Sequence, residues 1–299
     1  MTVEYKKHNK SDGYISTWPL PSVEELQRFY SEFYYQTPKS SSYQESYDDV
    51  EIEYKNLKCN ALIYALGSHS STNGAERTFL DIGAGEGFLL NAADLGGFDI
   101  TGIDFSAYGV AKFFPHLASR HIAGDIYESL QVLIEKGKKF SVCSSTNVLE
   151  HVLDPDLFLT SIRQVMEPGA MLAITVPNDF SDLQQFALSK GMIDREFWFV
   201  PPHHLNYFNT VTLTSYLHDQ GFEILDAFSD FPVDLYLLHP GSNYINESGN
   251  GSAAHRARMY HDLLIAKKSG LDNYLDYYRG MFKVGLGRDV TVIVRSKVG

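Results

Sequence analysis

Residues 79–90 read Phe-Leu-Asp-Ile-Gly-Ala-Gly-Glu-Gly-Phe-Leu-Leu, an apolar run, a glycine-rich stretch and a second apolar run. This pattern predicts a buried strand, a tight loop and a helix, because closely spaced glycines let the backbone turn sharply and approach a ligand. The helix start would face the loop with its N–H groups and positive dipole end, which favours a carboxylate or phosphate. Asp104 follows about 20 residues later, where an acid ending the next strand can accept hydrogen bonds from ribose hydroxyls. The loop and the acid together indicate an adenosine-type ligand.

The rest of the chain from Thr78 onward alternates short apolar runs with helical stretches. Such alternation is typical of an α/β fold with a parallel sheet built from strand–helix units. Pro168-Gly169 is expected to break the chain before the fifth strand. We predict strands at 78–82, 99–103, 121–123, 140–145, 171–176, 222–228 and 289–294, and helices at 87–95, 157–166 and 211–220.

Residues 1–76 precede this alternation and are interpreted as an N-terminal helical preface or lid to the main domain, residues 77–299. Ser22 and Glu25 make a capping-box pattern, so a helix is expected to begin there. A second helix is predicted over 48–66. The Ser/Tyr/Gln-rich stretch 34–47 is interpreted as a loop or lid, and 67–74 as a linker.

A long segment, residues 229–288, separates the last two predicted strands and is too long for a plain hairpin. It contains a turn-rich patch at 241–251 and two predicted helices, 255–268 and 271–283. We interpret it as a helical cap insertion over the active face, or as an oligomer surface that would make the protein a homodimer.

Charge and composition limit the classes of partner that the protein is expected to bind. The 299-residue chain carries a formal net charge of −12, whereas a nucleic-acid binder needs concentrated Lys and Arg. We therefore expect small-molecule substrates and no nucleic acid. No apolar run approaches the roughly 20 residues that span a bilayer, so no membrane association is expected. Cys59 and Cys143 lack metal-type spacing, which favours a reduced, cytoplasmic protein.

The spacing of the glycines separates two ligand types. A dinucleotide-binding loop requires a third glycine where Phe88 stands. The arrangement Gly-x-Gly-x-Gly, with Asp81 before it, instead resembles the first motif of class I S-adenosylmethionine (SAM)-dependent methyltransferases. The resemblance implies SAM as cofactor, with the acid near its amino group and the loop backbone against its methionine part (Gly83, Ala84, Gly85 and Gly87).

Three later motifs follow in the family's order, so that the resemblance covers residues 76–230. Ile103-Asp104-Phe105 resembles the ribose-binding end of the second strand, and Gly124-Asp125-Ile126 the motif that flanks the adenine. The stretch from Ser145 through Asn147 to Pro155 resembles the fourth-strand motif that lines the methyl-transfer site. The resemblance implies a Rossmann-like, seven-stranded, mostly parallel sheet with an antiparallel last strand and helices on both faces.

The stretch Pro201-Pro202-His203-His204-Leu205-Asn206-Tyr207-Phe208 resembles a segment of the methyltransferase-23 type family. Many such proteins act in bacterial sugar, polysaccharide or natural-product pathways, and the stretch around Trp18 resembles the preface of their sugar methyltransferases. The Cys-rich zinc ribbon of sugar C-methyltransferases is missing, which disfavours carbon as the methyl acceptor.

Methyl transfer to a hydroxyl group needs a base, and a neutral imidazole suits that task near neutral pH. His204 aligns with the family's recurring histidine and is our first candidate; His151, just after the fourth strand, is the second. We expect His203, Asn178 and Tyr207 to contact substrate. Candidates for holding a substrate phosphate are Arg256, Arg258 and Arg288. No metal site is expected, because adjacent histidines cannot face one way on a regular element.

The leading hypothesis is SAM-dependent O-methylation of a small polar metabolite such as a sugar, nucleotide sugar or glycan precursor. Methylation of nitrogen, of a phosphate oxygen, or of a quinone or other natural product stays open. A SAM-binding scaffold without catalysis is a further alternative, and an NAD-dependent oxidoreductase is disfavoured by the glycine spacing.

Overall fold

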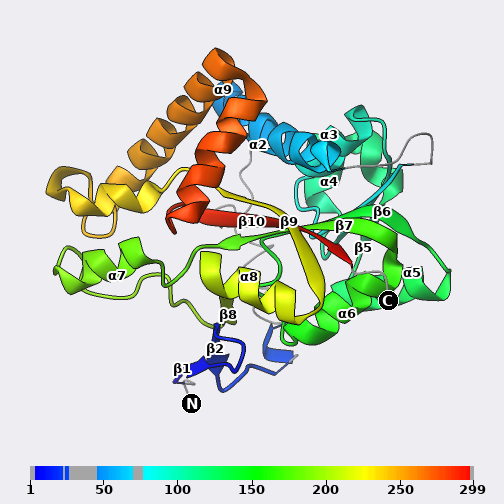
Figure 1. The fold of residues 1–299 in the computed structure, drawn as a ribbon, viewed down its shortest axis with the longest axis horizontal. Coiled ribbons are helices and arrows are strands. Elements are labelled where there is room, and N and C mark those ends of the chain that lie inside the picture. The colour runs from blue at the N-terminus through cyan, green and yellow to red at the C-terminus, as the bar shows by residue number, and fades with distance from the viewer. Residues whose placement is uncertain (1–3, 23, 27–45, 70–76, 297–299) are drawn as a thin grey trace.

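The computed structural model describes residues 4–22, 24–26, 46–69 and 77–296. At its centre is a seven-stranded sheet with the strand order β5-β4-β3-β6-β7-β10-β9 (Figure 1). The bounds are β3 Thr78–Ile82, β4 Asp99–Asp104, β5 His121–Ala123, β6 Phe140–Thr146, β7 Met166–Pro177, β9 Phe222–Ser229 and β10 Asp289–Ser296. Strands β3 to β7 are parallel, whereas β10 runs antiparallel to both β7 and β9. The predicted Rossmann-like α/β fold is confirmed.

Helices cover both faces of the sheet, as predicted (Figure 1). One face packs against α5 (Ile126–Glu135), α6 (Pro155–Val165) and α8 (Thr210–Asp219). The other packs against α2 (Asp49–Ser68), α3 (Phe88–Leu95) and α9 (Asn250–Lys283). Two shorter helices, α4 (Tyr108–Phe113) and α7 (Asp182–Ser189), lie in the connections. Across the described part of the chain, no helix combines the length and apolar character needed to cross a membrane.

The N-terminal preface contains a β-hairpin that the sequence did not predict. Strands β1 (Lys6–Asn9) and β2 (Ile15–Trp18) pair antiparallel around a turn, in which Gly13 has a φ of 87°. Strand β2 then pairs with β8 (Asn206–Tyr207), which makes a small second sheet. Four-residue strands with mostly polar residues give little periodicity, so this sheet depends on pairing between segments far apart in the sequence.

The helical part of the preface agrees with the sequence where it is described. Ser22 and Glu25 form the predicted capping box, and Asp48 and Glu51 form a second one at the start of α2. Helix α2 continues to Ser68, two residues into the stretch interpreted as a linker. Most of the predicted lid, 34–47, lies outside the described residues, as do residues 27–30 of the first helix.

Strand β7 begins earlier than predicted. Pro168-Gly169 does not separate α6 from the strand, because the two residues lie inside β7, where Gly169 has a φ of 75°. The register against β6 shifts there, so that Phe140 faces Met166 but Val142 faces Met171. The Pro-Gly pair therefore makes an irregularity within the strand rather than a break before it.

The insertion before β10 is largely helical, as predicted. Two short 3₁₀ helices, η3 (Val233–Leu238) and η4 (Pro240–Ser242), lead into α9. Gly270 interrupts α9 with a φ of 77° and a ψ of 172°, so α9 consists of two arms that correspond to the two predicted helices. The arms pack against α2 and β9, above the sheet in Figure 1.

Candidate active site

A cavity of about 990 Å³ lies at the carboxyl ends of the parallel strands. Gly83, Asp104, Asn147 and Pro177, which end or follow β3, β4, β6 and β7, all line it. Helices α2 and α9 supply its outer walls. Ligands bind at this edge in open α/β sheets, so the cavity is the candidate active site.

The loop after β3 forms the floor of the cavity. The backbone N–H groups of Gly83 and Ala84 donate to the carbonyl oxygen of Ile103, at 2.8 and 2.9 Å. Gly83 has a φ of 81°, and a Cβ added there would lie 2.2 Å from Cγ2 of Val148. Only glycine fits this position, since any side chain would meet both backbone strain and a collision.

Asp81 lies buried at the end of β3 and lines the cavity. The hydroxyl of Ser144 donates to its Oδ1 at 2.7 Å. Burial raises the pKa of Asp81 to about 7, outweighing the Ser144 hydrogen bond that lowers it. A nearby ammonium group would offset that burial, which suits the predicted contact with the cofactor's amino group.

Asp104 joins two loops at the cavity. Its Oδ2 accepts from the N–H of Gly85 at 2.9 Å and its Oδ1 from the N–H of Ser106 at 3.0 Å. Burial raises its pKa, while the two backbone hydrogen bonds oppose the shift. Each carboxylate oxygen has a second lone pair, so the same group can also accept from ribose hydroxyls.

The other predicted cofactor residues also line the cavity. Phe105 is 44% exposed, which leaves its ring accessible to a ligand. Asp125 caps α5 by accepting from two backbone N–H groups and stands beside Ile126. Asn147 adopts a φ of 55° and donates its N–H to Thr175. Gly87 differs, because it does not line the cavity and instead caps α3 against Val110.

His151 lies in the cavity wall, and a neighbouring carbonyl group determines which of its ring nitrogens carries the hydrogen. Its Nδ1 is 2.6 Å from the carbonyl oxygen of His203, which can only accept, so Nδ1 carries the hydrogen. Nε2 is 3.7 Å from a carboxylate oxygen of Glu150. Burial and the neighbouring imidazoles hold the pKa of His151 well below its ordinary value. Burial also raises the pKa of Glu150, so this pair is disposed to be neutral.

His204 lies beside a carboxylate that is itself paired with an arginine. Its Nδ1 lies 3.6 Å from Oδ2 of Asp179, slightly beyond hydrogen-bond distance. Arg288 donates to Oδ1 of the same carboxylate at 2.8 Å. Although burial alone would raise it, the pKa of Asp179 is lowered, chiefly by the charge of Arg288. An ionised carboxylate therefore stands beside the ring that faces the cavity.

The three histidines meet, although adjacent histidines on a regular element would point apart. His203 and His204 follow the turn at Pro201-Pro202, outside any helix or strand, and their rings stack with centroids 4.8 Å apart. One ligand atom from each of His151, His203 and His204 can be chosen so that all lie within 4.8 Å of one another. The premise that His203 and His204 must diverge is therefore wrong, and the cluster offers three ligand atoms that could hold a metal ion.

Two predicted substrate residues make hydrogen bonds within the protein, although Oδ1 of Asn178 has no partner in the ranges that the structure describes. The amide of Asn178 donates to the carbonyl oxygens of Gly285 and Gly287. The hydroxyl of Tyr207 donates to the carbonyl oxygen of His204 at 2.8 Å. Neither side chain lines the cavity, whereas His203 does. Asn178 and Tyr207 hydrogen-bond to the loops around the site, and their contact with substrate stays a prediction.

Several cavity residues were missed because their partners come from distant segments. Tyr54 and Lys58 lie on α2, four residues apart and thus on one helix face. His255 of α9 and the carboxylates of Asp230 and Asp289 complete this side of the cavity. The one available signal was the Tyr/Lys spacing on the predicted helix 48–66.

Comparison with known proteins gives a family match over residues 53–227, more than half of the chain. The matching family, methyltransferase-23, is described as a methyltransferase domain. The match includes the strands β3 to β7 and all but the last residues of β9.

Two curated relatives carry the name ubiquinone biosynthesis O-methyltransferase. The protein from Sinorhizobium medicae is 33% identical over 101 residues, which are 33% of this chain and 40% of the relative. The protein from Caulobacter vibrioides is 32% identical over 129 residues, 42% of this chain and 50% of the relative. The chain thus spans half or less of the length of these relatives.

A solved structure, the plantazolicin methyltransferase BamL in complex with a desmethylPZN analog and S-adenosylhomocysteine (SAH), has a similar fold. The TM-score is 0.50 at 12% identity, covering 90% of this chain and 93% of that chain. At this identity the similarity concerns the fold alone.

Proposed function

We propose, on the premise that this chain belongs to the methyltransferase-23 family, that it methylates a hydroxyl group of a small polar metabolite. Membership confirms the predicted enzyme class, a SAM-dependent methyltransferase, and with it the cofactor. A sugar, nucleotide sugar or glycan precursor is the proposed acceptor.

The cofactor half of the cavity is proposed to be the side formed by β3, β4 and β5. Asp81 and the loop from Gly83 to Gly87 would hold the amino acid part of SAM, and Asp104 the ribose. Phe105, Asp125, Ile126 and Asn147 would surround the adenine and the reacting end. When bound, SAM supplies an electrophilic methyl group for in-line attack; the chain's residues bind, align the acceptor and exclude water.

His204 is the proposed base for the acceptor hydroxyl. The observation that carries this proposal is the row Arg288–Asp179–His204, which ends at the cavity. When the imidazole takes up a proton, the ionised carboxylate of Asp179 stabilises the resulting charge. Burial and the neighbouring imidazoles hold the pKa of His151 well below its ordinary value, which disfavours a protonated ring. We therefore propose a positioning role for His151 through its neutral ring.

The test compares His204→Ala with the exposed, surface-paired His218→Ala as a control. Release of SAH is measured with a panel of sugars, nucleotide sugars and phenols. Loss of a general base predicts that His204→Ala lowers kcat by about 10²- to 10⁴-fold with unchanged SAH affinity. Turnover by His204→Ala equal to that of His218→Ala would remove His204 as the base.

Two alternatives use the same cavity. The names of the curated relatives favour oxygen as the acceptor atom but point to a phenolic rather than a sugar hydroxyl. The phenols in the panel distinguish these acceptors. The histidine cluster also favours a second candidate, metal-assisted O-methylation, because imidazoles bind Zn²⁺ and related ions. In that case a chelator abolishes turnover and added metal restores it.

We also propose a domain organisation, a class of partner and a cellular location for this chain. We propose residues 1–76 as a preface, 77–299 as the methyltransferase domain and 229–288 as a cap, since α9 lines the cavity. The net charge of −12 supports the absence of a nucleic-acid partner. The free thiols of Cys59 and Cys143 support a reducing, cytoplasmic location. A homodimer through the insertion is the alternative role for 229–288.

A further inference from the structure

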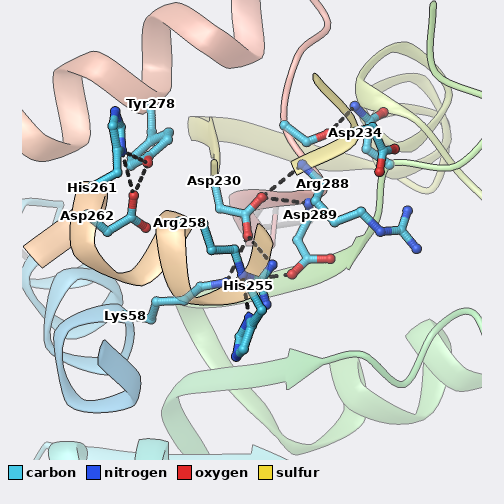
Figure 2. A network of polar contacts seen from close by, with 12 residues as sticks. Lys58, Asp230, Asp234, His255, Arg258, His261, Asp262, Tyr278, Arg288 and Asp289 are labelled. Atoms are coloured by element: carbon cyan, nitrogen blue, oxygen red, sulfur yellow. Dashed lines mark hydrogen bonds and ion pairs between the residues drawn. The ribbon is translucent and has the colours of Figure 1, made fainter. Parts of the chain in front are cut away.

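The three arginines singled out as phosphate candidates have different surroundings. Arg256 pairs with Asp48 at the surface, and Arg288 donates to Asp179. Only Arg258 lines the cavity. Figure 2 shows the guanidinium of Arg288 directed away from Lys58 and Arg258. Of the three arginines, Arg258 is therefore the candidate for contact with a ligand in the cavity.

Arg258 lacks a hydrogen-bonded carboxylate among the described residues. Its Nε donates to Nδ1 of His255 at 2.9 Å, and the nearest carboxylate oxygen, on Asp230, is 4.0 Å from Nη1. Asp230 already accepts from Lys58 at 3.0 Å and from two backbone N–H groups. The side chain of Arg258 is only 19% exposed, so its charge is largely removed from water without a full partner.

A second polar group beside Arg258 is also unsatisfied. The hydroxyl of Tyr54 is buried and has no hydrogen-bond partner within the described part of the chain. The Tyr54 ring centroid lies 5.7 Å from the Arg258 guanidinium carbon and 5.9 Å from Nζ of Lys58. We call Tyr54, Lys58, His255 and Arg258 the cationic corner; all four line the cavity.

The carboxylates in this corner contact Lys58 more closely than Arg258. Lys58 pairs with Asp230 and Asp289, and the charge of Asp262 also acts on Lys58 and Arg258 (Figure 2). The two cations lower the pKa of Asp230 despite its burial, whereas burial and the charge of Asp230 raise the pKa of Asp289. Both carboxylates lie within 3.5 Å of the Lys58 ammonium, whereas no carboxylate that the structure describes lies within hydrogen-bond distance of Arg258, so an anion beside Arg258 would complete its contacts.

The carboxylates that border the cationic corner lie on the β9–β10 side of the cavity. Asp289 begins β10 and Asp230 directly follows β9, at the same edge as the glycine loop. The sheet order places β10 three strands from β3, roughly 14 Å at 4.8 Å per strand. We take this β10 side of the cavity as the acceptor side.

We propose that the cationic corner binds an anionic group, a carboxylate or phosphate, carried by the methyl acceptor. Arg258 offers its remaining N–H donors, Tyr54 its hydroxyl and Lys58 its charge. This inference rests on the proposed function, because it describes the acceptor of the same reaction. An acceptor with such a group would be held by charge-assisted hydrogen bonds while its hydroxyl lies nearer the histidines.

The test measures binding without turnover, so its outcome is independent of whether hydroxyl methylation occurs. The SAH-saturated protein is titrated calorimetrically, at constant ionic strength, with inorganic phosphate, benzoate and the neutral isostere benzamide. We expect phosphate and benzoate to bind, and benzamide to bind about tenfold more weakly or not at all. Arg258→Gln should weaken the binding of both anions by about tenfold or more, while the surface control Arg256→Gln should leave their affinities unchanged.

Two results would overturn the proposal. The first is that the wild-type protein does not bind the anions, or that the wild type and Arg258→Gln bind them equally well. The other is a loss of SAH affinity in Arg258→Gln, since the anion would then be the cofactor's own carboxylate. A titration with methylthioadenosine, which lacks that carboxylate, identifies this second case because the variant would bind it normally.

Folding of the variant is itself informative. A ligand-binding arginine without a full partner should not stabilise the ligand-free protein, so Arg258→Gln should keep or raise the wild-type melting temperature. A structural arginine would instead lower it by several degrees, which would count against the proposal. Arg258→Lys, which keeps the charge, should retain part of the anion binding.

Discussion

The two halves of the cavity are built in different ways. The proposed cofactor half is built around residues close together in the sequence, Asp81 to Gly85 and Asp104, joined by hydrogen bonds from backbone N–H groups. The acceptor half joins side chains from α2, from the loops after β6 and β7, and from α9. One half is a local motif with fixed backbone geometry, whereas the other is a set of charges that meet only after folding. Substitutions should therefore have different consequences in each.

Gly83→Ala should have the largest effect on the cofactor half. The new Cβ would lie 2.2 Å from Val148, which displaces the loop, so SAH affinity should fall by about 100-fold or more. Gly97→Ala is the matched control, because Gly97 has nearly the same φ but open space around its missing Cβ. Calorimetric titration with SAH checks both. Equal losses in the two variants would mean that backbone strain, and not the collision, matters.

Asp104→Asn should have the second-largest effect on SAH binding. Asparagine has one acceptor oxygen and an NH₂ group that only donates, so one of the two backbone N–H groups that now bond to the carboxylate loses its acceptor. We therefore expect SAH to bind about 10- to 100-fold more weakly. Asp99→Asn, at the exposed other end of β4, serves as the control. Normal SAH affinity in Asp104→Asn would contradict the assignment of the ribose to this acid.

The pH dependence of SAH binding should show a smaller, graded effect. Asp81 has a pKa of about 7 in the cofactor-free protein, so below that pH its carboxyl group is mostly protonated. If the cofactor's ammonium requires the ionised form, binding must release this proton. Affinity should then fall as the pH drops below about 7, by up to about tenfold per pH unit.

Titrations between about pH 5 and pH 8 measure this dependence. Asp81→Asn should bind SAH more weakly and with a nearly flat pH profile. An unchanged profile in Asp81→Asn would assign the proton to another group.

Tyr207→Phe should have the smallest effect on the reaction. The lost hydroxyl leaves the N–H of Val200 and the carbonyl of His204 without this partner, which should cost about 1–2 kcal/mol of stability. Because the hydroxyl faces the protein, kcat/KM should change by less than about threefold. Denaturant unfolding and turnover measure the two quantities. A large rise in KM with normal stability would identify Tyr207 as a substrate contact.

The same contrast explains what could be predicted from the sequence. Strand β3 with its loop, Asp104 and Asp125 follow from local patterns, because consecutive parallel strands bring their ends to one edge. Side-chain direction does not follow, which is why Asn178 and Tyr207 were expected to line the cavity although neither does. Nor does pairing between distant segments, which creates the β1–β2–β8 sheet and the cationic corner.

The histidine cluster could not be predicted from the sequence for the same reason. Adjacent histidines were expected to diverge, since a regular helix or strand would separate them. The irregular segment after Pro201-Pro202 lets His203 and His204 stack and both meet His151. Its geometry depends on the turn and on the backbone of the loop after β6, which sequence patterns do not describe.

Parallel SAH titrations of Gly83→Ala and His204→Gln test the division of the cavity most directly. The two-half arrangement predicts that Gly83→Ala abolishes measurable SAH binding. His204→Gln should bind SAH within about twofold of the wild type, since distant sites act independently. Comparable losses of SAH affinity in both variants would contradict it.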